Sequence, residues 1–232
     1  MQTDDSGSAY PADSGSDSNP GARGFFISFE GAESSGKSTQ ANLLTSWMTE
    51  RGHVVVRTRE PGGTEVGERI RRILLGDGEE LVPATEALLF AAARAELVHT
   101  VIRPALQRRK VVICDRYIDS SIAYQAFGLG LEEDDVISVN RWALRLAIPD
   151  LTIVLGRGSE LVASGEIVQP DRIETRDEEF HRRVRLGYAE LAQRHPERMV
   201  IVDTTSGVDA TAAEIREIVM NRLNVGRRTP GK

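Results

Sequence analysis

The sequence contains a single cysteine and no long apolar run. Cys114 is the only cysteine among the 232 residues, which excludes an internal disulfide framework and a multi-cysteine metal site. Because chains without disulfides are typical of reducing compartments, we expect a cytoplasmic protein. No apolar stretch approaches the ~20 residues that span a bilayer. The acidic N-terminal stretch also lacks the basic and apolar regions of a signal peptide, so we expect no membrane partner.

Lysine is scarce as well, and acidic residues outnumber basic ones. The chain has 29 Lys and Arg against 35 Asp and Glu, a formal charge of −6, and only three of the bases are lysines (Lys37, Lys110 and Lys232). A general nucleic-acid binder would show a basic excess, so we expect no nucleic-acid partner. Net charge governs solubility and steering, however, and it leaves a local phosphate site open.

The chain divides by composition into a domain with two tails. Residues 1–23 are rich in Ser, Gly, Asp and Pro and have almost no apolar side chain to repay the entropy of ordering, so they predict a disordered acidic tail. Residues 24–225 predict a single domain, and residues 226–232 form a short C-terminal tail.

Apolar strand patterns and helical patterns alternate within the domain. The predicted strands are 25–29, 54–58, 111–114, 151–155 and 199–202. The predicted helices are about 37–51, 64–75, 84–109, 132–147, 176–195 and 208–223, with Pro104 expected to kink or end the third. Nearly continuous apolar strands joined by helices indicate a buried parallel sheet. We therefore predict a three-layer α/β fold with a five-stranded parallel sheet flanked by helices.

A phosphate-binding loop follows the first strand. The segment Gly31-Ala32-Glu33-Ser34-Ser35-Gly36-Lys37-Ser38, followed by Thr39, matches G-x-x-x-x-G-K-[ST] between a strand and a helix. Its backbone N–H groups would bind the phosphates of a nucleoside triphosphate, and Lys37 would reach the β- and γ-phosphates. Ser38 could bind Mg²⁺ together with Asp115, which ends the third strand. The alternative for the loop is a chance match at a Gly/Ser-rich turn. The alternative for Asp115 is that it caps a helix.

Three arginines point to a second phosphorylated molecule. Arg59 ends the second strand, Arg116 follows Asp115, and Arg94 lies one helical turn after Phe90. The planar guanidinium suits a phosphate monoester, and an aromatic ring such as Phe90 can stack on a base. Taken singly, Arg59 is also compatible with a surface turn and Phe90 with the core.

These residues belong to a pattern over 25–223 that resembles the thymidylate kinase family. The matching pieces are the loop with an acid at Glu33, Arg59-Glu60-Pro61-Gly62-Gly63-Thr64, Leu89-Phe90-Ala91-Ala92-Ala93-Arg94, Asp115-Arg116-Tyr117, Ser120-Ser121, Ala123-Tyr124-Gln125, Pro149-Asp150-Leu151, Asp171-Arg172-Ile173-Glu174 and Gly187-Tyr188-Ala189-Glu190-Leu191. The resemblance implies a P-loop NTPase-type fold, a homodimer and Mg²⁺-dependent transfer of the ATP γ-phosphoryl group to dTMP.

The resemblance also implies roles at the dTMP site. Phe90 would stack on thymine, Arg94 would bind the base or phosphate, and Arg59 and Arg116 would hold the phosphate. Further dTMP contacts would come from Ser121 and Gln125 at the thymine edge, Tyr124 against a 2′-hydroxyl, Tyr188 over the thymine side and Glu33 near the 3′-hydroxyl.

Two departures from the family pattern stand out. Ser34 replaces a common glycine, at a cost of about 1 kcal/mol if that position needs a positive φ. The lid, at about 157–172, has no base between Leu161 and Pro170. We therefore expect Arg157 or Arg172 to supply the transition-state charge.

Several alternatives remain open at this point. Another monophosphate kinase, a deoxynucleoside kinase or a nucleotide-binding switch with slow transfer would also use the loop. The turn Val202-Asp203-Thr204 could lie near the adenine or could cap a helix.

Overall fold

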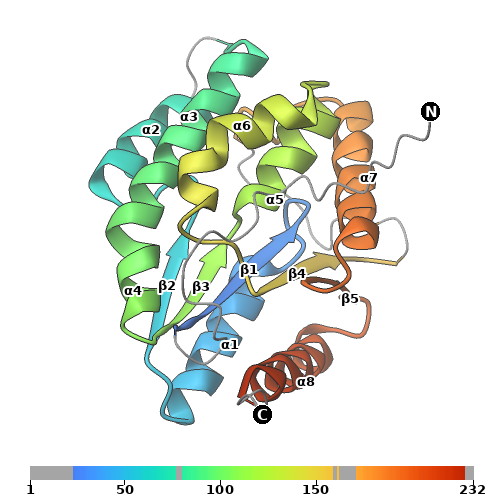
Figure 1. The fold of residues 1–232 in the computed structure, drawn as a ribbon. Helices are drawn as coiled ribbons and strands as arrows, with labels where there is room; N and C mark the ends of the chain where they lie inside the picture. Colours follow the sequence, from blue (N-terminus) through green and yellow to red (C-terminus); the bar gives the residue numbers. More distant parts are fainter. Residues whose placement is uncertain (1–22, 77–79, 159–160, 162–170, 228–232) are drawn as a thin grey trace, which may run out of the picture.

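Five parallel strands form the centre of the computed structural model, which describes residues 23–76, 80–158, 161 and 171–227 (Figure 1). The strands are β1 (Phe25–Gly31), β2 (Val55–Arg59), β3 (Val111–Asp115), β4 (Leu151–Gly156) and β5 (Met199–Asp203). Their order in the sheet is β2-β3-β1-β4-β5, and all pairs are parallel. The predicted fold class is confirmed. Because β1 lies at the centre, the loop that follows it opens at the middle of the sheet edge.

Helices cover both faces of the sheet. They are α1 (Lys37–Glu50), α2 (Glu65–Leu75), α3 (Pro83–Leu97), α4 (Arg103–Gln107), α5 (Ile118–Ser121), α6 (Glu133–Leu144), α7 (Glu178–Arg194) and α8 (Val208–Arg227), with two π-helical segments, η1 (Val98–Ile102) and η2 (Ile122–Gly128). Figure 1 shows α1 and α8 on one face and the other helices on the opposite face.

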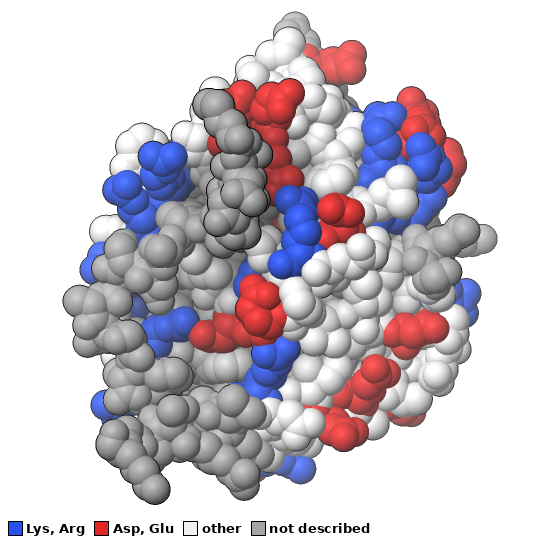
Figure 2. Space-filling view, turned by 45° about the vertical axis from the view of Figure 1, so that its right-hand side comes forward, with Lys and Arg blue, Asp and Glu red and all other residues white. Residues whose placement is uncertain are grey.

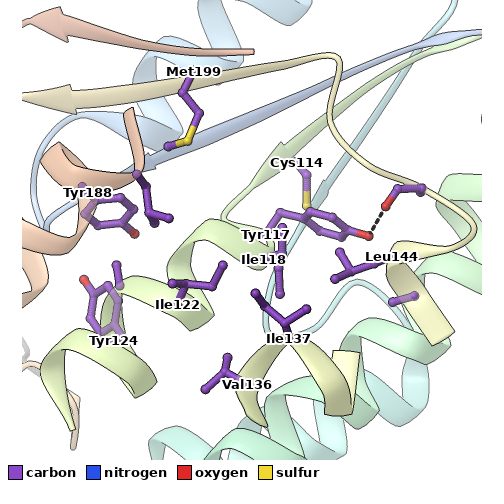
Figure 3. Packing of buried hydrophobic residues seen from close by; sticks show 14 of the residues in the cluster. Cys114, Tyr117, Ile118, Ile122, Tyr124, Val136, Ile137, Leu144, Tyr188 and Met199 are labelled. Carbon is purple, nitrogen blue, oxygen red and sulfur yellow. Dashed lines mark hydrogen bonds between the residues drawn. The ribbon is translucent and has the colours of Figure 1, made fainter. Parts of the chain in front are cut away.

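Each face of the sheet has its own apolar core. Ile27 and Phe29 of β1 pack with Leu44 of α1 in one core. Phe26 belongs to the core on the opposite face, which also contains Tyr188 of α7. Figure 3 shows part of this second core, where the rings of Tyr124 and Tyr188 meet edge to face at 6.3 Å. Burial on both faces explains why the strand sequences do not alternate in polarity.

The helix predicted over 84–109 is divided into α3, η1 and α4. Pro104 stands in the first turn of α4, directly after the π-helical segment. A proline has no N–H to donate, and the change to i→i+5 bonding occurs in the turn before it. The helical path therefore continues to Gln107 instead of ending at Pro104. The segments α5 and η2 were not predicted.

The ends of the chain differ slightly from the predicted boundaries. Arg23, placed in the predicted tail, forms a 2.7 Å ion pair with Asp150. Helix α8 extends to Arg227, two residues into the predicted C-terminal tail. The remaining tail residues, 1–22 and 228–232, lie outside the described residues, as does most of the predicted lid.

The surface carries charges of both signs. On the face drawn in Figure 2, basic and acidic side chains occur next to one another. Exposed ion pairs, such as that of Arg182 with Glu179 at 2.7 Å, also lie at the surface of the protein. In the part of the chain that the structure describes, no helix is both long enough and apolar enough to cross a membrane.

Candidate functional site

The loop after β1 is shaped by backbone conformations that few residues adopt. Gly31 has φ 126°, and a Cβ there would lie 2.2 Å from the carbonyl oxygen of Leu155, so only glycine fits. Ser34 adopts φ 53°, so this position does use the positive φ considered above. The buried ammonium of Lys37 donates to the carbonyl oxygens of Ala32 at 2.6 Å and Gly31 at 3.2 Å. Burial, and then the charge of Arg116, lower the pKa of Lys37 to about 7.

Two oxygen ligands suited to a magnesium ion meet beside this loop. The Ser38 hydroxyl donates to Asp115 Oδ2 at 2.5 Å, and the Asp115 carboxylate is mostly buried at the end of β3. Arg57 approaches the same carboxylate at 3.8 Å. Mg²⁺ is usually held by one or two carboxylates together with substrate phosphates and water. The pair fits that pattern, and the described residues contain no cluster of three His, Cys, Asp or Glu side chains for another metal.

A cavity of about 290 Å³ lies at the carboxyl-terminal edge of the strands, next to Lys37 and Asp115. Its wall combines the phosphate loop, the turn after β2, helices α2 and α3, the β3–α5 region, η2 and a turn at 171–174. The lining residues are Glu33, Ser34, Lys37, Ser38, Arg59, Glu60, Pro61, Arg71, Leu75, Phe90, Asp115, Arg116, Ser120, Ser121, Tyr124, Gln125, Asp171, Ile173 and Glu174. Most of the predicted site residues are thus brought together on one wall.

Arg116 is held in a fixed position at the junction of the loop and the cavity. It adopts φ 68°, which is costly for a residue other than glycine. Its guanidinium donates to the carbonyl oxygen of Gly31 at 3.1 Å and to Glu33 at 3.1 Å. It also lies over the ring of Tyr124, 5.0 Å from the ring centroid. This arrangement places a cation between the phosphate loop and the wall of η2.

Glu33 is the common partner of several groups. It accepts a hydrogen bond from the Tyr124 hydroxyl as well as from Arg116. Although burial opposes ionisation, Arg116 and Tyr124 hold the pKa of Glu33 below its usual range. His181 Nδ1 lies 3.8 Å from the second Glu33 oxygen. This proximity of His181 to Glu33 depends on how α7 packs.

Arg94 is fully enclosed and does not line the cavity. Its guanidinium pairs with Glu60 at 2.6 Å and donates to Ser121 Oγ, Asn140 Oδ1 and the carbonyl oxygen of Tyr117. Four of its guanidinium N–H groups thus donate hydrogen bonds, to Glu60, Ser121, Asn140 and Tyr117. Arg94 therefore fixes Ser121, which does line the cavity.

Tyr188 is likewise buried behind the cavity wall. Its hydroxyl lies 2.8 Å from Ser120 Oγ, and it accepts from Arg116 at 3.3 Å and donates to Glu30 at 3.1 Å. Glu30 also accepts from Ser120 at 2.5 Å. Burial and the nearby carboxylate of Asp119 raise the pKa of Glu30 to about 8. Through the hydroxyl groups of Ser120 and Tyr188, this buried network holds the Arg116 guanidinium in position.

The far wall of the cavity is aromatic and polar. Phe90 is half-buried, and it lines the cavity while packing on the core. Gln125, in η2, also lines the cavity and donates from Nε2 to Glu86 Oε1 at 3.1 Å. A flat ring and an amide on one wall suit a heterocyclic base.

Arginines of the β2–α2 region form another part of the wall. Arg59 is half-exposed and bound to Glu68 at 2.9 Å. Arg71 lines the cavity and donates to the carbonyl oxygen of Pro61 at 2.9 Å. Sequence reasoning missed Arg71. Its spacing from Gly67 and Leu74, the buried positions of α2, placed a base on the inward face of the helix and could have identified it.

The two arginines expected to serve the transition state lie outside the cavity wall. Arg172 binds Glu86 at 2.7 Å and the carbonyl oxygen of Leu74 at 3.0 Å. Arg157 is exposed after β4. The Asp203 carboxylate accepts hydrogen bonds from the backbone N–H groups of Gly158 and Thr205. It therefore links the segments that follow β4 and β5.

Comparisons with known proteins point to one family. Residues 29–215 match the family model for thymidylate kinase. The chain is 44% identical over 206 residues to a thymidylate kinase of Exiguobacterium sp., covering 88% of this chain and 97% of that protein. It is 50% identical over 189 residues to one from Pelotomaculum thermopropionicum, covering 79% and 87%.

A solved structure shows the same likeness. The crystal structure of thymidylate kinase from Ehrlichia chaffeensis matches with a TM-score of 0.69 and 33% identity, over 84% of this chain and 98% of that one. The resemblance inferred from the sequence motifs is thereby confirmed. The chain belongs to the thymidylate kinase family.

Proposed function

We propose that the cavity binds dTMP beside ATP on the phosphate loop and that the residues described above carry the family's reaction. The chain transfers the γ-phosphoryl group of ATP to dTMP, giving dTDP and ADP. The observation that carries the proposal is the position of Arg116, which contacts Gly31 and Glu33 of the phosphate loop and itself lines the cavity. A cation at that junction can bind a phosphoryl group shared between two substrates.

Positioning and charge stabilisation account for the chemistry. The acceptor is a phosphate oxygen that is already ionised near neutral pH, so the reaction needs no strong general base. Lys37 would hold the β- and γ-phosphates, while Arg59 and Arg116 would hold the acceptor phosphate. Arg71 lines the same wall and adds a further cation for that phosphate. The transition-state charge is assigned to Arg172 or Arg157.

Ser38 and Asp115 are the residues that would hold Mg²⁺. When bound, the ion supplies Lewis-acid neutralisation of charge on the ATP phosphates. Asp115 also fixes the end of β3, because its backbone carbonyl accepts from the N–H of Glu60 at 2.9 Å. This hydrogen bond therefore holds the end of β3, which carries the Asp115 carboxylate, against the turn after β2.

The base and sugar contacts follow from the far wall. Phe90 would stack on thymine, and Ser121 and Gln125 would bond its polar edge. Arg94 would act through Ser121, since its own donors are engaged. Tyr124, bonded to Glu33, would fill the space of a ribose 2′-hydroxyl. Tyr188 would support this wall from behind.

A coupled ADP-release assay tests the choice of acceptor. Purified protein with saturating MgATP is supplied in turn with dTMP, dUMP, UMP, AMP, GMP and thymidine. We expect the highest kcat/KM with dTMP and weak activity with UMP, because a ribose would clash with Tyr124. A preference for a purine monophosphate or for thymidine would reject the proposed acceptor site.

The protein is further proposed to be a cytoplasmic homodimer. Four exposed apolar side chains lie on the neighbouring helices α2, α3 and α6: Val66, Ile73, Leu88 and Trp142. Trp142 has 77% of its surface exposed in the single chain. A second copy covering this surface would remove that exposure. Light scattering should give twice the monomer mass, and Trp142→Glu should give the monomer mass. A wild-type monomer would reject the dimer.

A further inference from the structure

We infer that Glu86 is a positioning residue that fixes the side-chain amide of Gln125 with its carbonyl oxygen toward the base, so that the cavity selects a pyrimidine with an N3–H donor over cytosine. This inference rests on the proposed binding of the base beside Phe90 and Gln125. It assigns a specificity role to a residue that does not line the cavity.

Glu86 is completely buried in α3 and contacts Gln125 directly. Gln125 Nε2 donates to Glu86 Oε1 at 3.1 Å. An ionised carboxylate only accepts hydrogen bonds, whereas a glutamine amide has a donor end and an acceptor end. The nitrogen of Gln125 must therefore face Glu86. The reverse orientation would bring two acceptor oxygens together in a buried place, which is strongly unfavourable.

Two arginines keep Glu86 in its ionised form. Arg172 and Arg176 each lie 2.7 Å from Glu86 Oε2. Burial by itself favours the neutral acid, but the hydrogen bonds and charges of Arg176 and Arg172 hold the pKa of Glu86 below its usual range. The carboxylate thus stays an acceptor near neutral pH. Through Glu86, both arginines act on the orientation of the Gln125 amide.

The acceptor end of Gln125 is left for the substrate. Gln125 lines the cavity, and no described residue donates to its Oε1. Thymine and uracil present an N3–H donor between two carbonyl groups, so they match this acceptor. Cytosine presents an unprotonated N3 acceptor at the same place, which would face Oε1 without a proton between them. A buried mismatch of this kind discriminates far more strongly than a difference in shape.

Ser121 adds a second directional group on the same wall. Its oxygen accepts from Arg94 Nη1 at 3.0 Å, which leaves the hydroxyl hydrogen to donate to a base carbonyl. An acceptor at Gln125 beside a donor at Ser121 complements the N3–H and carbonyl sequence of thymine. Glu86 sets the orientation of the Gln125 amide, and Arg94 sets that of the Ser121 hydroxyl. Both of these charged residues are buried.

The test compares acceptors on one preparation of each variant. For wild type and Glu86→Gln, kcat/KM is measured with dTMP, dUMP and dCMP at saturating MgATP. A glutamine at 86 can bond either end of the Gln125 amide, so the amide becomes free to turn. We expect wild type to prefer dTMP over dCMP by roughly 10³-fold or more. In Glu86→Gln this ratio should fall at least about tenfold, while the dTMP to dUMP ratio stays within about twofold.

Controls separate specificity from structural damage. A ratio taken on one preparation cancels the fraction of folded enzyme, so a general defect lowers all three rates together. Glu86→Asp keeps an ionised acceptor and should keep the dCMP ratio near its wild-type value. If Glu86→Gln gives no soluble protein, Glu86→Met also removes the obligatory acceptor and should show the same loss of discrimination.

The outcomes distinguish this inference from the proposed function. An unchanged dTMP to dCMP ratio in Glu86→Gln or Glu86→Met overturns the inference, as does an equal loss in Glu86→Asp. If wild type prefers dCMP to dTMP, the inference is also wrong. A wild type that phosphorylates none of the three pyrimidines overturns the proposed function itself.

Discussion

The hydroxyl of Ser38 donates a 2.5 Å hydrogen bond to the carboxylate of Asp115, joining the start of α1 to the end of β3. The two residues are 77 positions apart in the sequence. Their contact brings two hard oxygen ligands to one point beside Lys37, the place where the phosphates of ATP would lie.

Replacing Asp115 by Asn should impair use of the metal. The change keeps the shape but removes the charge that attracts Mg²⁺, so we expect the Mg²⁺ concentration for half-maximal activity to rise by roughly tenfold or more. The measurement is a magnesium titration of the initial rate at fixed ATP. Asp203→Asn, at the end of β5, serves as the matched control. An unchanged titration for Asp115→Asn would reject this site.

Binding of ATP should take up protons on the alkaline side of neutrality. With its pKa lowered to about 7, Lys37 is mostly neutral in the free protein at pH 8. The phosphates favour its charged form, so binding at pH 8 should take up close to one proton, and binding at pH 6 almost none. Calorimetry in buffers of different ionisation enthalpy measures this number. Lys37→Arg stays charged, so equal uptake by that variant would assign the proton elsewhere.

Glu30 should make the stability of the protein fall as the pH rises. Its pKa is about 8 in the folded protein against an ordinary value of 4.5, so between these values the folded state binds more protons. Each pH unit in this window costs up to about 1.4 kcal/mol. Glu30→Gln removes the titration, so its free energy of unfolding should rise relative to wild type between pH 5 and pH 8.

Urea unfolding at several pH values measures this difference. Glu217→Gln, on the exposed side of α8, is the control and should run parallel to wild type. A parallel curve for Glu30→Gln would show that Glu30 does not titrate in this range.

One of two arginines near the predicted lid should be needed for turnover. If Arg157 or Arg172 supplies transition-state charge, its replacement by Ala should lower kcat at least tenfold, in a role worth ~10³–10⁵ in other systems. Arg176→Ala is the control, because Arg176 binds the same Glu86 as Arg172. If neither Arg157→Ala nor Arg172→Ala lowers kcat more than a few-fold, the assignment is wrong.

Local sequence patterns were sufficient for the sheet and the phosphate loop. The apolar strand β1 and the Gly31–Ser38 motif are continuous in sequence, so their conformation depends mainly on neighbouring residues. The positive φ of Ser34 could be anticipated from the family resemblance, because relatives commonly have glycine at that position. The strand ends also placed Arg59 and Asp115 at one edge, and they are register partners in the sheet.

Side-chain partners were harder to predict because they depend on packing between distant elements. Arg94 was expected to face the substrate, yet a buried carboxylate 34 positions away, Glu60, holds it beneath the wall. The π-helical segment η2 that carries Tyr124 and Gln125 has no distinct sequence period. A buried pair such as Glu86 and Gln125 likewise becomes visible only when α3 lies against η2.

The most direct test of the account measures both products of one reaction. Protein is incubated with MgATP in the presence and absence of dTMP, and dTDP and ADP are quantified by phosphorus NMR. We predict equal amounts of dTDP and ADP with dTMP and almost no ADP without it. ADP that appears without dTDP, or at the same rate without dTMP, would contradict the account and indicate a nucleotide hydrolase or switch.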